Sequence, residues 1–204
     1  MATRQNIVPP NLVLAPKQYE QRYQDQLNNV QRLFYAGIAN QINSPLPYGQ
    51  FITTGSFTNT GTANQEKLVT FAIETDGFHT KLGDVKSRLY VAETGIYNVQ
   101  FSAQCDLTSG SNKDIYFWLK QNGKNVPASA GVITVSSSAP QMAAWNWVLL
   151  LRDGDYIELA WSSSDTHAKL LGETGLTSPV RPDVPAVILT IVWVSPYNTS
   201  TGIS

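Results

Sequence analysis

The 204-residue sequence carries little charge, which limits the partners that it can attract. Lys, Arg, Asp and Glu make up 14% of the chain, whereas about a quarter is usual in globular proteins. The fourteen basic residues nearly cancel the fifteen acidic ones, and the formal net charge is -1 at pH 7. A chain without a basic field does not concentrate phosphate groups or anionic lipids around itself. We therefore expect neither nucleic-acid binding nor attachment to a membrane surface.

Residues that form cross-links or membrane spans are also scarce. Cys105 is the single cysteine, so no intrachain disulfide can form, and we expect its thiol to be a small buried group within a strand. No run of about 18 apolar residues occurs, and no basic segment followed by an apolar one stands at the N-terminus. Neither a membrane span nor a signal peptide is expected, and stability must come from packing or from association with other chains.

The usual signatures of catalysis are missing as well. His79 and His167 are the two histidines, and neither stands at a spacing that chelates zinc. There is no nucleophile elbow and no phosphate-binding glycine loop. Residues 153–155 (Asp-Gly-Asp) with Glu158 come nearest to a calcium site, but two Asp around a Gly are also ordinary turn chemistry, which we favour. We expect no enzymatic activity, no cofactor and no bound metal.

The sequence begins with an apolar arm over residues 1–16. Pro9, Pro10 and Pro16 are incompatible with a helix and favour an extended segment. Its hydrophobic side chains need a surface that covers them. We favour a surface on a neighbouring copy or a larger assembly, and the alternative is that the arm folds back on its own domain. The candidate anchoring residues are Ile7, Val8, Leu12, Val13 and Leu14.

Residues 17–44 have the periodicity of one helix. Their apolar residues recur in steps of three or four, which places them on a single helix face. This face consists of Tyr19, Tyr23, Leu27, Val30, Phe34 and Ile38. Pro45 and Pro47 end the helical segment. Because a helix of this length is marginal on its own, we expect it to associate with copies of itself, and packing along the following domain is the alternative.

After Pro47 the apolar period changes to two, which is typical of half-buried strands. Clear examples are residues 96–103, 145–151, 157–161 and 187–193. Turn residues such as Asn122-Gly123 stand between these segments. About nine such strands in the remaining chain predict an all-β sandwich or barrel.

Two of the expected strands are apolar on both faces. Their second faces consist of Ala144, Val148 and Leu150 in residues 143–151, and of Ile188, Val192 and Val194 in residues 187–194. A sandwich strand in a monomer needs only one apolar face. Such a strand is either covered by loops or belongs to an interface between subunits, and we favour the interface. The candidate interface residues are Tyr97, Tyr116, Trp118, Trp145, Trp147, Val192 and Val194.

Three runs follow one another along this region: residues 94–102 (TGIYNVQFS), 118–124 (WLKQNGK) and 151–159 (LRDGDYIEL). A Gly-x-Tyr strand, an Asn-Gly hairpin and a Gly-Asp strand in this order resemble the domain related to C1q and tumour necrosis factor. The resemblance covers about residues 50–194. The form with Trp at positions 145 and 147 is similar to one in virion proteins of tailed bacteriophages, where a helix rich in Tyr, Gln and Asn also precedes the β domain.

The resemblance implies a fold and an assembly. The expected fold is all-β, a C1q/TNF-like jelly-roll sandwich of about ten strands over residues 45–196, preceded by the extended arm and one N-terminal helix and followed by a polar tail over residues 197–204. It also implies a tight homotrimer, in which the candidate interface residues lie between subunits and the helix is a three-fold stalk or anchor. The collagen-like stalk of the vertebrate members is absent, so their immune partners do not carry over.

The resemblance further implies a non-enzymatic structural protein on the surface of a virion, on the capsid or on the tail. The arm and the helix would bind other virion proteins, either the major capsid protein or tail proteins. We favour a decoration (cement) protein that stabilises the capsid, because the chain is short and its anchor small. The alternatives are a short tail fibre or spike that recognises a host surface glycan, and a soluble lectin-like carbohydrate-binding module.

Overall fold

The computed structural model describes residues 10, 18, 21–137 and 139–197. The chain divides into two compact units, Met1–Pro45 and Leu46–Ser204. The predicted arm lies outside the described residues except for Pro10, and so do its candidate anchoring residues, together with Tyr19 of the predicted helix face. The predicted polar tail also lies outside them, except for Tyr197.

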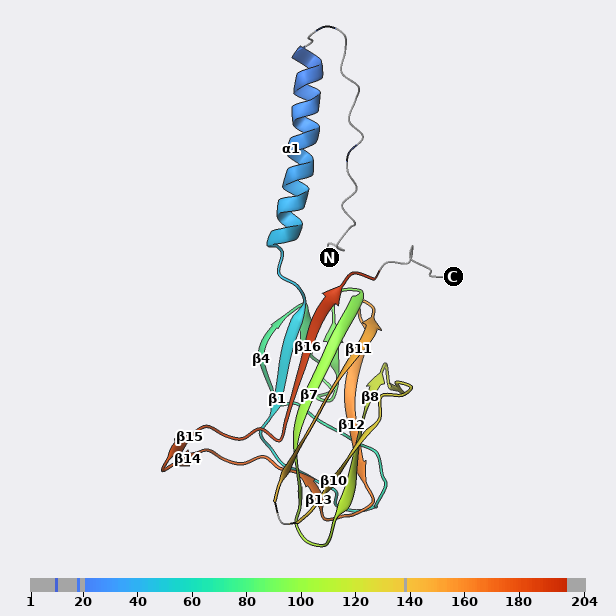
Figure 1. Ribbon diagram of the computed structural model, residues 1–204, viewed down its shortest axis with the longest axis vertical. Helices are drawn as coiled ribbons and strands as arrows, with labels where there is room; N and C mark the ends of the chain where they lie inside the picture. The colour runs from blue at the N-terminus through green and yellow to red at the C-terminus, as the bar shows by residue number, and fades with distance from the viewer. Residues whose placement is uncertain (1–9, 11–17, 19–20, 138, 198–204) are drawn as a thin grey trace. The chain divides into compact units, whose positions relative to one another are not determined.

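The first unit contains one described helix, α1 (Gln21–Asn43), shown in blue in Figure 1. It ends directly before Ser44 and Pro45, because proline has no amide hydrogen for the helical ladder and its ring clashes with the preceding turn. Leu33 and Tyr35 are exposed on α1, outside the stripe that the sequence predicts. The apolar part of α1 is therefore broader in its C-terminal half than expected.

The second unit is built from antiparallel strands. The longer strands are β1 (Tyr48–Thr53), β4 (Ile73–Phe78), β5 (Thr80–Leu82), β6 (Leu89–Val91), β7 (Gly95–Leu107), β8 (Lys113–Gln121), β10 (Gly131–Val135), β11 (Gln141–Leu151), β12 (Tyr156–Ser163) and β16 (Val187–Ser195). The shorter ones are β2 (Phe57–Thr58), β3 (Lys67–Leu68), β9 (Lys124–Asn125), β13 (Ala168–Leu170), β14 (Leu176–Thr177) and β15 (Val180–Arg181).

The longer strands form two sheets. The first sheet has the order β4-β1-β16-β7, and β11 pairs with the other edge of β7. The second sheet has the order β10-β8-β12-β6-β5. Phe101 of β7 contacts Phe117 of β8 across the two sheets, with 5.0 Å between ring centroids. The core therefore lies between the sheets, which form the sandwich in the lower part of Figure 1.

The pairing order identifies the sandwich as a jelly roll. Eight strands in chain order are β1, β6, β7, β8, β10, β11, β12 and β16. The first pairs with the last, the second with the seventh, the third with the sixth and the fourth with the fifth. This nested pairing of a long folded hairpin defines the jelly roll. The predicted all-β jelly-roll sandwich is confirmed. With β4 and β5, each sheet has five of the longer strands, and two short strands bring each sheet to seven.

The alternation of the sequence decides which side chains fill the core. Along β7, every second residue from Gly95 to Leu107 is buried, and the residues between them are partly or fully exposed. A one-residue slip of this strand would turn its entire apolar set outward, so the alternation also fixes the register. The largest buried side chains are Trp161, Tyr97, Phe51, Phe71 and Phe117.

Strand β12 is an exception because it is buried on both faces. The side chains of Glu158 and Ala160 point away from the core and are still buried. Strand β3 pairs with β12, and Ser87 and Arg88 contact the Glu158 carboxylate. The chain covers the second face of β12 with its own loops.

In the part of the chain that the structure describes, no helix has the length and apolarity that crossing a membrane requires.

Cys105 provides a test of the core. It is fully buried in β7, and this burial raises the pKa of its thiol to about 12. Thiolate is the reactive form, so we expect the native protein at pH 8 to react with Ellman's reagent only as slowly as it unfolds. Protein unfolded in guanidinium chloride should release one equivalent of the chromophore at once. Fast stoichiometric reaction of native protein would contradict this placement of β7.

Candidate self-association interface

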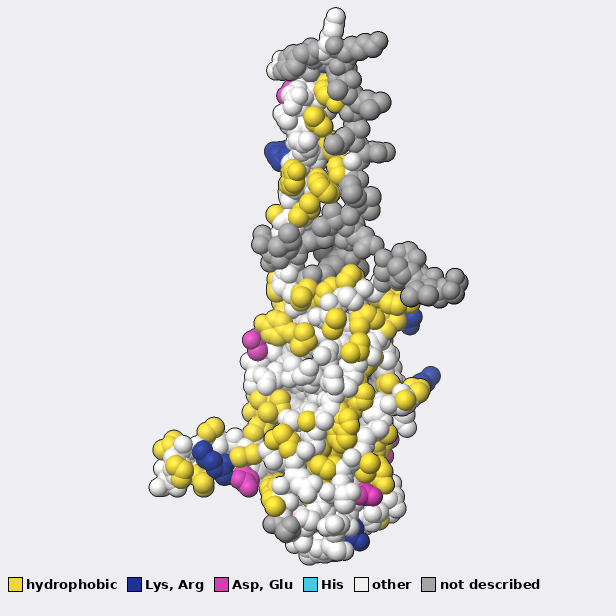
Figure 2. Space-filling model, in the orientation of Figure 1, with side chains coloured by type: hydrophobic (Ala, Val, Ile, Leu, Met, Phe, Trp, Pro, Cys, Tyr) yellow, Lys and Arg dark blue, Asp and Glu magenta, His cyan; other side chains and the backbone are white. Residues whose placement is uncertain are grey.

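Four strands of the first sheet share an outer face whose central part has no charged side chain. In β1, β7, β11 and β16 the residues that alternate with core residues point away from the second sheet. We call this set, without Asp106 at the end of β7, the uncharged face. It consists of Tyr48, Gln50, Ile52, Ile96, Asn98, Gln100, Ser102, Gln104, Met142, Ala144, Asn146, Val148, Leu150, Ile188, Thr190, Val192 and Val194. Figure 2 shows this side of the sheet, with hydrophobic side chains on the face and charged ones at its margins.

Strand register arranges the uncharged face in rows. One row joins Tyr48, Val192, Asn98 and Val148 across the four strands. The next row is polar and consists of Gln50, Thr190, Gln100 and Asn146. The third row is Ile52, Ile188, Ser102 and Ala144. Two rows with apolar side chains therefore flank a row of amides and a hydroxyl.

The first row and the neighbouring Val194 are open to solvent, whereas Ile52 and Ile188 of the third row are half-buried. Val148 is 65% exposed, Val194 54% and Val192 42%. An exposed apolar patch of several contiguous residues marks an interaction site more often than an ordinary surface. Charge depletion is likewise typical of the central part of protein–protein interfaces. Burial by a partner would stabilise an assembly here, and the polar row would form hydrogen bonds.

The charges nearest to the uncharged face lie at its margins. Tyr48 donates a 3.3 Å hydrogen bond from its hydroxyl to Asp76 of β4, and the Asp76 charge raises the pKa of Tyr48. At the other end of β7, Asp106 is paired with Lys169 at 2.9 Å. These groups form a polar rim around the apolar rows.

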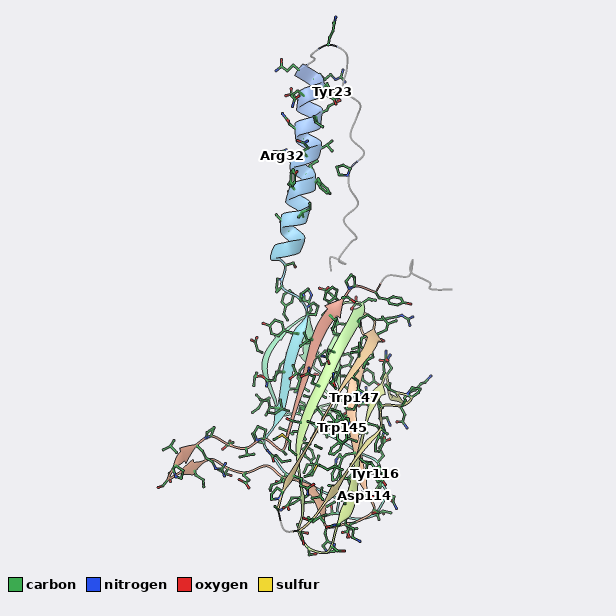
Figure 3. All side chains as sticks on the ribbon, in the orientation of Figure 1. Tyr23, Arg32, Asp114, Tyr116, Trp145 and Trp147 are labelled. Atoms are coloured by element: carbon green, nitrogen blue, oxygen red, sulfur yellow. The ribbon has the colours of Figure 1, made fainter. Side chains whose placement is uncertain are left out.

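The predicted interface residues fall on different surfaces. Val192 and Val194 lie on the uncharged face. Tyr116 and Trp118 belong to β8, on the outer face of the second sheet, where the Trp118 indole N–H donates to Asn125 Oδ1 at 3.1 Å. Figure 3 labels Tyr116 and the two tryptophans of β11.

Trp145 and Trp147 lie at the edge of the sandwich. Both stack on Phe101, with ring centroids 5.5 and 5.3 Å away and interplanar angles of 13° and 10°. Trp147 also donates its indole N–H to the Ser129 carbonyl oxygen at 2.9 Å. Both side chains are half-buried, so they close the core between β11 and β10 and still present a surface.

Tyr97 requires a correction, because its side chain has no exposed surface for a partner. It is 0% exposed, and its hydroxyl donates a 2.7 Å hydrogen bond to the Glu93 carbonyl oxygen within the same chain. Its position in the sequence already indicated this, since Tyr97 shares the face of Val99 and Phe101.

Sequence reasoning missed other members of the uncharged face. Tyr48, Ile52 and Met142 were not among the predicted interface residues. The signal for two of them is the short segment Tyr48–Thr53, in which Gly49, Phe51 and Thr53 are buried between outward residues. This alternation is detectable only once the inward set is known, because a Gly and a Thr give no hydrophobic signal.

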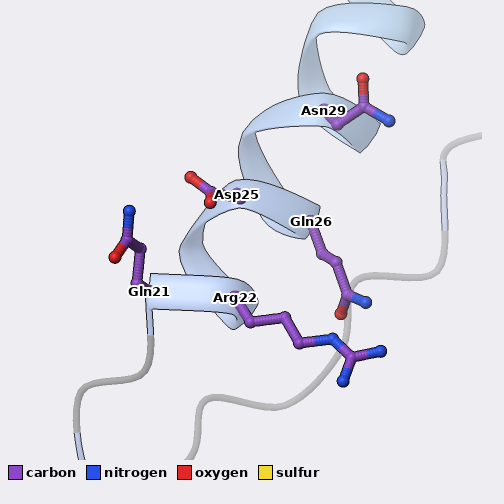
Figure 4. Close-up of a pocket in the computed structure, with 5 residues that line it drawn as sticks. All are labelled: Gln21, Arg22, Asp25, Gln26 and Asn29. Atoms are coloured by element: carbon purple, nitrogen blue, oxygen red, sulfur yellow. The ribbon is translucent and has the colours of Figure 1, made fainter.

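The helix α1 has an apolar face and polar sides. The described members of the predicted stripe, Tyr23, Leu27, Val30, Phe34 and Ile38, share one face of α1 by their spacing. The first turns carry polar side chains on their other sides, which Figure 4 shows around a shallow hollow: Gln21, Arg22, Asp25, Gln26 and Asn29. The polar residues are suited to solvent, and the stripe is the part of α1 that a partner would cover.

The titratable residues that the sequence singled out are dispersed. His79 pairs with Glu93 and stacks on Phe78 at 3.9 Å between ring centroids. The His167 ring contacts Asp165 at 2.9 Å. Among the described residues, no group of three or more His, Cys, Asp or Glu side chains is arranged to hold a metal ion.

The Asp155 carboxylate connects two turns by hydrogen bonds. Its carboxylate accepts hydrogen bonds from Gln121 Nε2 at 2.9 Å, Asn122 Nδ2 at 2.7 Å and the Arg152 amide at 2.8 Å. Burial alone raises the pKa of this carboxyl, but the hydrogen bonds from Arg152, Asn122 and Gln121 outweigh it and leave the pKa below the ordinary value of 3.8. Glu158 is directed instead to Ser87, at 2.7 Å. These contacts support the turn interpretation over a calcium site.

Comparisons with known proteins give matches among solved structures alone. No family model matches the sequence, and no curated protein matches it. The fold is similar to that of murine APRIL at pH 5.0, with a TM-score of 0.49, 11% identity, and coverage of 74% of this chain and 100% of that chain. It is also similar to the globular domain of zebrafish complement 1qA protein, with a TM-score of 0.46, 12% identity, and coverage of 74% and 99%. The strand order itself identifies the jelly roll.

The role of Asp155 can be tested by stability measurements. Asp155→Asn should lower the unfolding free energy by about 1 kcal/mol, or ~2–4 °C in Tm, because an amide cannot accept all three hydrogen bonds. The lowered pKa means that the carboxylate stabilises the fold above about pH 4 and that this contribution is lost as the pH falls through the folded-state pKa. Wild type and variant should therefore differ near neutral pH and converge in acid.

Asp153→Asn, in the same turn, is the matched control and should leave Tm unchanged. Millimolar calcium should not raise the Tm of either variant or of the wild type. A calcium-dependent rise in Tm that Asp155→Asn abolishes would instead establish a metal site.

Proposed function

We propose that this chain is a non-enzymatic structural protein that assembles as a homotrimer and is displayed on the surface of a virion. The observation that carries the proposal is the uncharged face, with its rows of exposed apolar side chains on four adjacent strands. Fully burying one Val side chain is worth about 1.5–3 kcal/mol. Three exposed Val side chains on one face therefore supply a driving force for association.

A cyclic trimer also accounts for apolar residues on more than one surface. In a ring of three, each copy contacts its two neighbours through two different patches. The uncharged face is suited to be one patch. Trp145 and Trp147 at the sandwich edge, with Tyr116 near it, are suited to be the other. The dispersed positions of the predicted interface residues are thus compatible with one assembly.

The helix supports the same assembly. A helix with one apolar stripe needs partners in water, and the exposed Leu33 and Tyr35 broaden the apolar surface of α1 beyond one stripe. A parallel bundle of three helices covers such a broad surface better than a pair does. The arm and α1 then serve as the attachment to other virion proteins, either the major capsid protein or tail proteins.

Capsid decoration is the role that we favour within the virion. The resemblance of the sequence to bacteriophage virion proteins supports this location.

A receptor-binding tail fibre or a lectin-like module is the second candidate. Tyr116 is exposed, and Trp118 is half-buried and hydrogen-bonded to Asn125. Aromatic side chains with a polar neighbour combine an apolar body and a hydrogen-bonding edge, which is suited to a sugar ring. The outer face of the second sheet is therefore where a host surface glycan would bind.

The oligomeric state tests the central part of the proposal. Light scattering of the wild type should give three times the chain mass of 22.4 kDa. Val148→Asp should shift the protein towards monomer, because it places a charge in the middle of an apolar contact, and its far-ultraviolet circular dichroism should not change. Val85→Asp is the matched control, since Val85 is 51% exposed but lies off the uncharged face, and it should remain trimeric.

A wild type that is monomeric at micromolar concentration would overturn the homotrimer. If Val148→Asp stays trimeric, the assembly exists but does not use the uncharged face.

The virion role is tested by copy number. Decoration predicts hundreds of copies in a purified particle, whereas a tail fibre predicts tens or fewer. A chain lacking residues 1–45 should keep its folded β unit, because the core lies within Leu46–Ser204, and should no longer join particles. Incorporation of the truncated chain at wild-type level would show that the attachment lies elsewhere, and absence from purified particles would overturn the virion role.

A further inference from the structure

The turn between β8 and β9 contains the one Asn-Gly pair of the sequence, at residues 122–123. Both residues are exposed, and both have positive φ, 51° at Asn122 and 77° at Gly123. This is the geometry of a two-residue hairpin turn, which Asn and Gly favour because they tolerate the left-handed region. The fold of the hairpin therefore calls for this pair and leaves it in contact with water.

An exposed Asn-Gly pair is also chemically labile, since Asn is among the less durable residues of proteins. The backbone nitrogen of the glycine attacks the side-chain amide carbon of the asparagine, because glycine has no side chain to hinder it. That nitrogen loses its proton, the side-chain nitrogen leaves as ammonia, and a succinimide ring results. Water then opens the ring at either carbonyl and leaves aspartate or isoaspartate. The net change replaces an amide and a water by a carboxylic acid and ammonia, so no oxidant or cofactor takes part.

The two reacting groups of this turn are held differently. The Gly123 N–H has no hydrogen-bond partner among the described residues. The Asn122 side chain is bound at both of its polar atoms: Nδ2 donates to Asp155 Oδ1 at 2.7 Å, and Oδ1 accepts from the Tyr156 amide at 3.0 Å. The turn thus leaves the attacking nitrogen free and fixes the amide that it would attack.

The backbone pairing shows that the fixed side chain is directed away from Gly123. The Asn122 amide donates to the Tyr156 carbonyl oxygen at 3.0 Å, and Asn122 Oδ1 accepts from the amide of the same residue. In a regular antiparallel pair the backbone carbonyl oxygen would accept that second bond. Here the positive φ turns the backbone away, and the side chain takes its place. The amide carbon is therefore held along β12, while the backbone continues into the turn.

Asp155 supplies the stronger of the two side-chain contacts. A carboxylate only accepts hydrogen bonds, and a charged acceptor makes a stronger bond than a neutral one. The carboxylate is half-buried and is itself fixed by Gln121 and by the Arg152 amide. Without Asp155, Asn122 Nδ2 would have no partner among the described residues. A single remaining hydrogen bond would let the side chain rotate towards Gly123.

We propose that Asn122 is a latent site of spontaneous deamidation and that Asp155 keeps it unreactive in the folded protein. The product would also break the connection that protects it. An aspartate at position 122 has no N–H to donate, and it brings a second carboxylate to Asp155, where like charges repel. An isoaspartate in addition lengthens the backbone of a two-residue turn. Deamidation and separation of the two turns therefore promote each other.

Mass spectrometry of the full-length protein, kept folded at pH 8, tests the protection. Deamidation is read as the mass gain of the peptide that contains residues 122–123, and fragmentation locates it. Asp155→Ala should deamidate faster than the wild type by about tenfold or more, because it removes a hydrogen bond to a charged group. Asp153→Ala, in the same turn, is the matched control and should deamidate at the wild-type rate.

Two further samples set the limits of this comparison. Wild type unfolded in guanidinium chloride gives the rate of the unprotected pair, and folded Asp155→Ala should approach it. Circular dichroism checks that each variant is folded. Asp155→Asn retains one carbonyl acceptor and should give a rate between those of the wild type and Asp155→Ala. It replaces Asp155→Ala in the comparison if that variant does not fold.

The variant Asn122→Asp reproduces the aspartate product and tests its effect on stability. Its Tm should be lower than that of Asn122→Gly, which also loses both side-chain hydrogen bonds but adds no charge and tolerates the positive φ. The difference between the two variants isolates the repulsion between the carboxylates at positions 122 and 155.

A folded Asp155→Ala that deamidates no faster than the folded wild type would overturn the inference. A folded wild type that deamidates as fast as the unfolded chain would do the same, because the fold would then give no protection. The oligomeric state does not enter these measurements, so either result leaves the proposed function standing.

Discussion

The pairing of β7 on both of its edges is the interaction on which the rest of the structure depends. β11 pairs along one edge for eleven residues, and β16 and then β13 pair along the other. Because side chains alternate along a strand, this pairing fixes at once which residues of three long strands face the core and which face outward. The uncharged face is therefore a consequence of the same register that buries Val99, Phe101 and Ala103. A substitution that shifted the register would exchange the side chains of the two faces, so one face cannot be changed in this way without the other.

This constraint also explains how far the sequence could predict the structure. The long strands and the helix over most of residues 17–44 follow from strict periodicity and from turn residues such as Asn122-Gly123, which has positive φ at both positions. The doubly apolar strands β11 and β16 were recognisable for the same reason. The jelly-roll order came from the family resemblance, because periodicity alone predicts only a sandwich or barrel. Tyr97 was misplaced because an aromatic residue is suited equally to a core and to an interface, although its alternation with Val99 and Phe101 already indicated the core. Tyr116 and Trp118 were expected at the same contact as Val192, although strand order puts them on the opposite sheet, and local periodicity contains no information about that order.

The outer faces of the two sheets differ in how far other parts of the chain bury them. On the second sheet, the outward residues Glu158 and Ala160 of β12 are buried, and Ser87 and Arg88 contact the Glu158 carboxylate. Among the described residues, no strand or loop covers the outer face of the first sheet at β11 and β16, where Val148, Val192 and Val194 are exposed. Charged residues are scarce in the whole sequence, and the uncharged face is where the structure leaves them out.

The nested pairing of the jelly roll has a consequence for how such a domain changes over time. Because the first strand pairs with the last, the β unit begins and ends at neighbouring positions, Tyr48 and Val192, at one end of the sandwich. A unit with adjacent ends can be joined to a new partner, or placed within a loop of another protein, without disturbing its sheets. The connections at the far end, including residues 172–185, are then free to vary in length and composition. Sequence changes at one end of the strands can therefore accumulate without disturbing the other end.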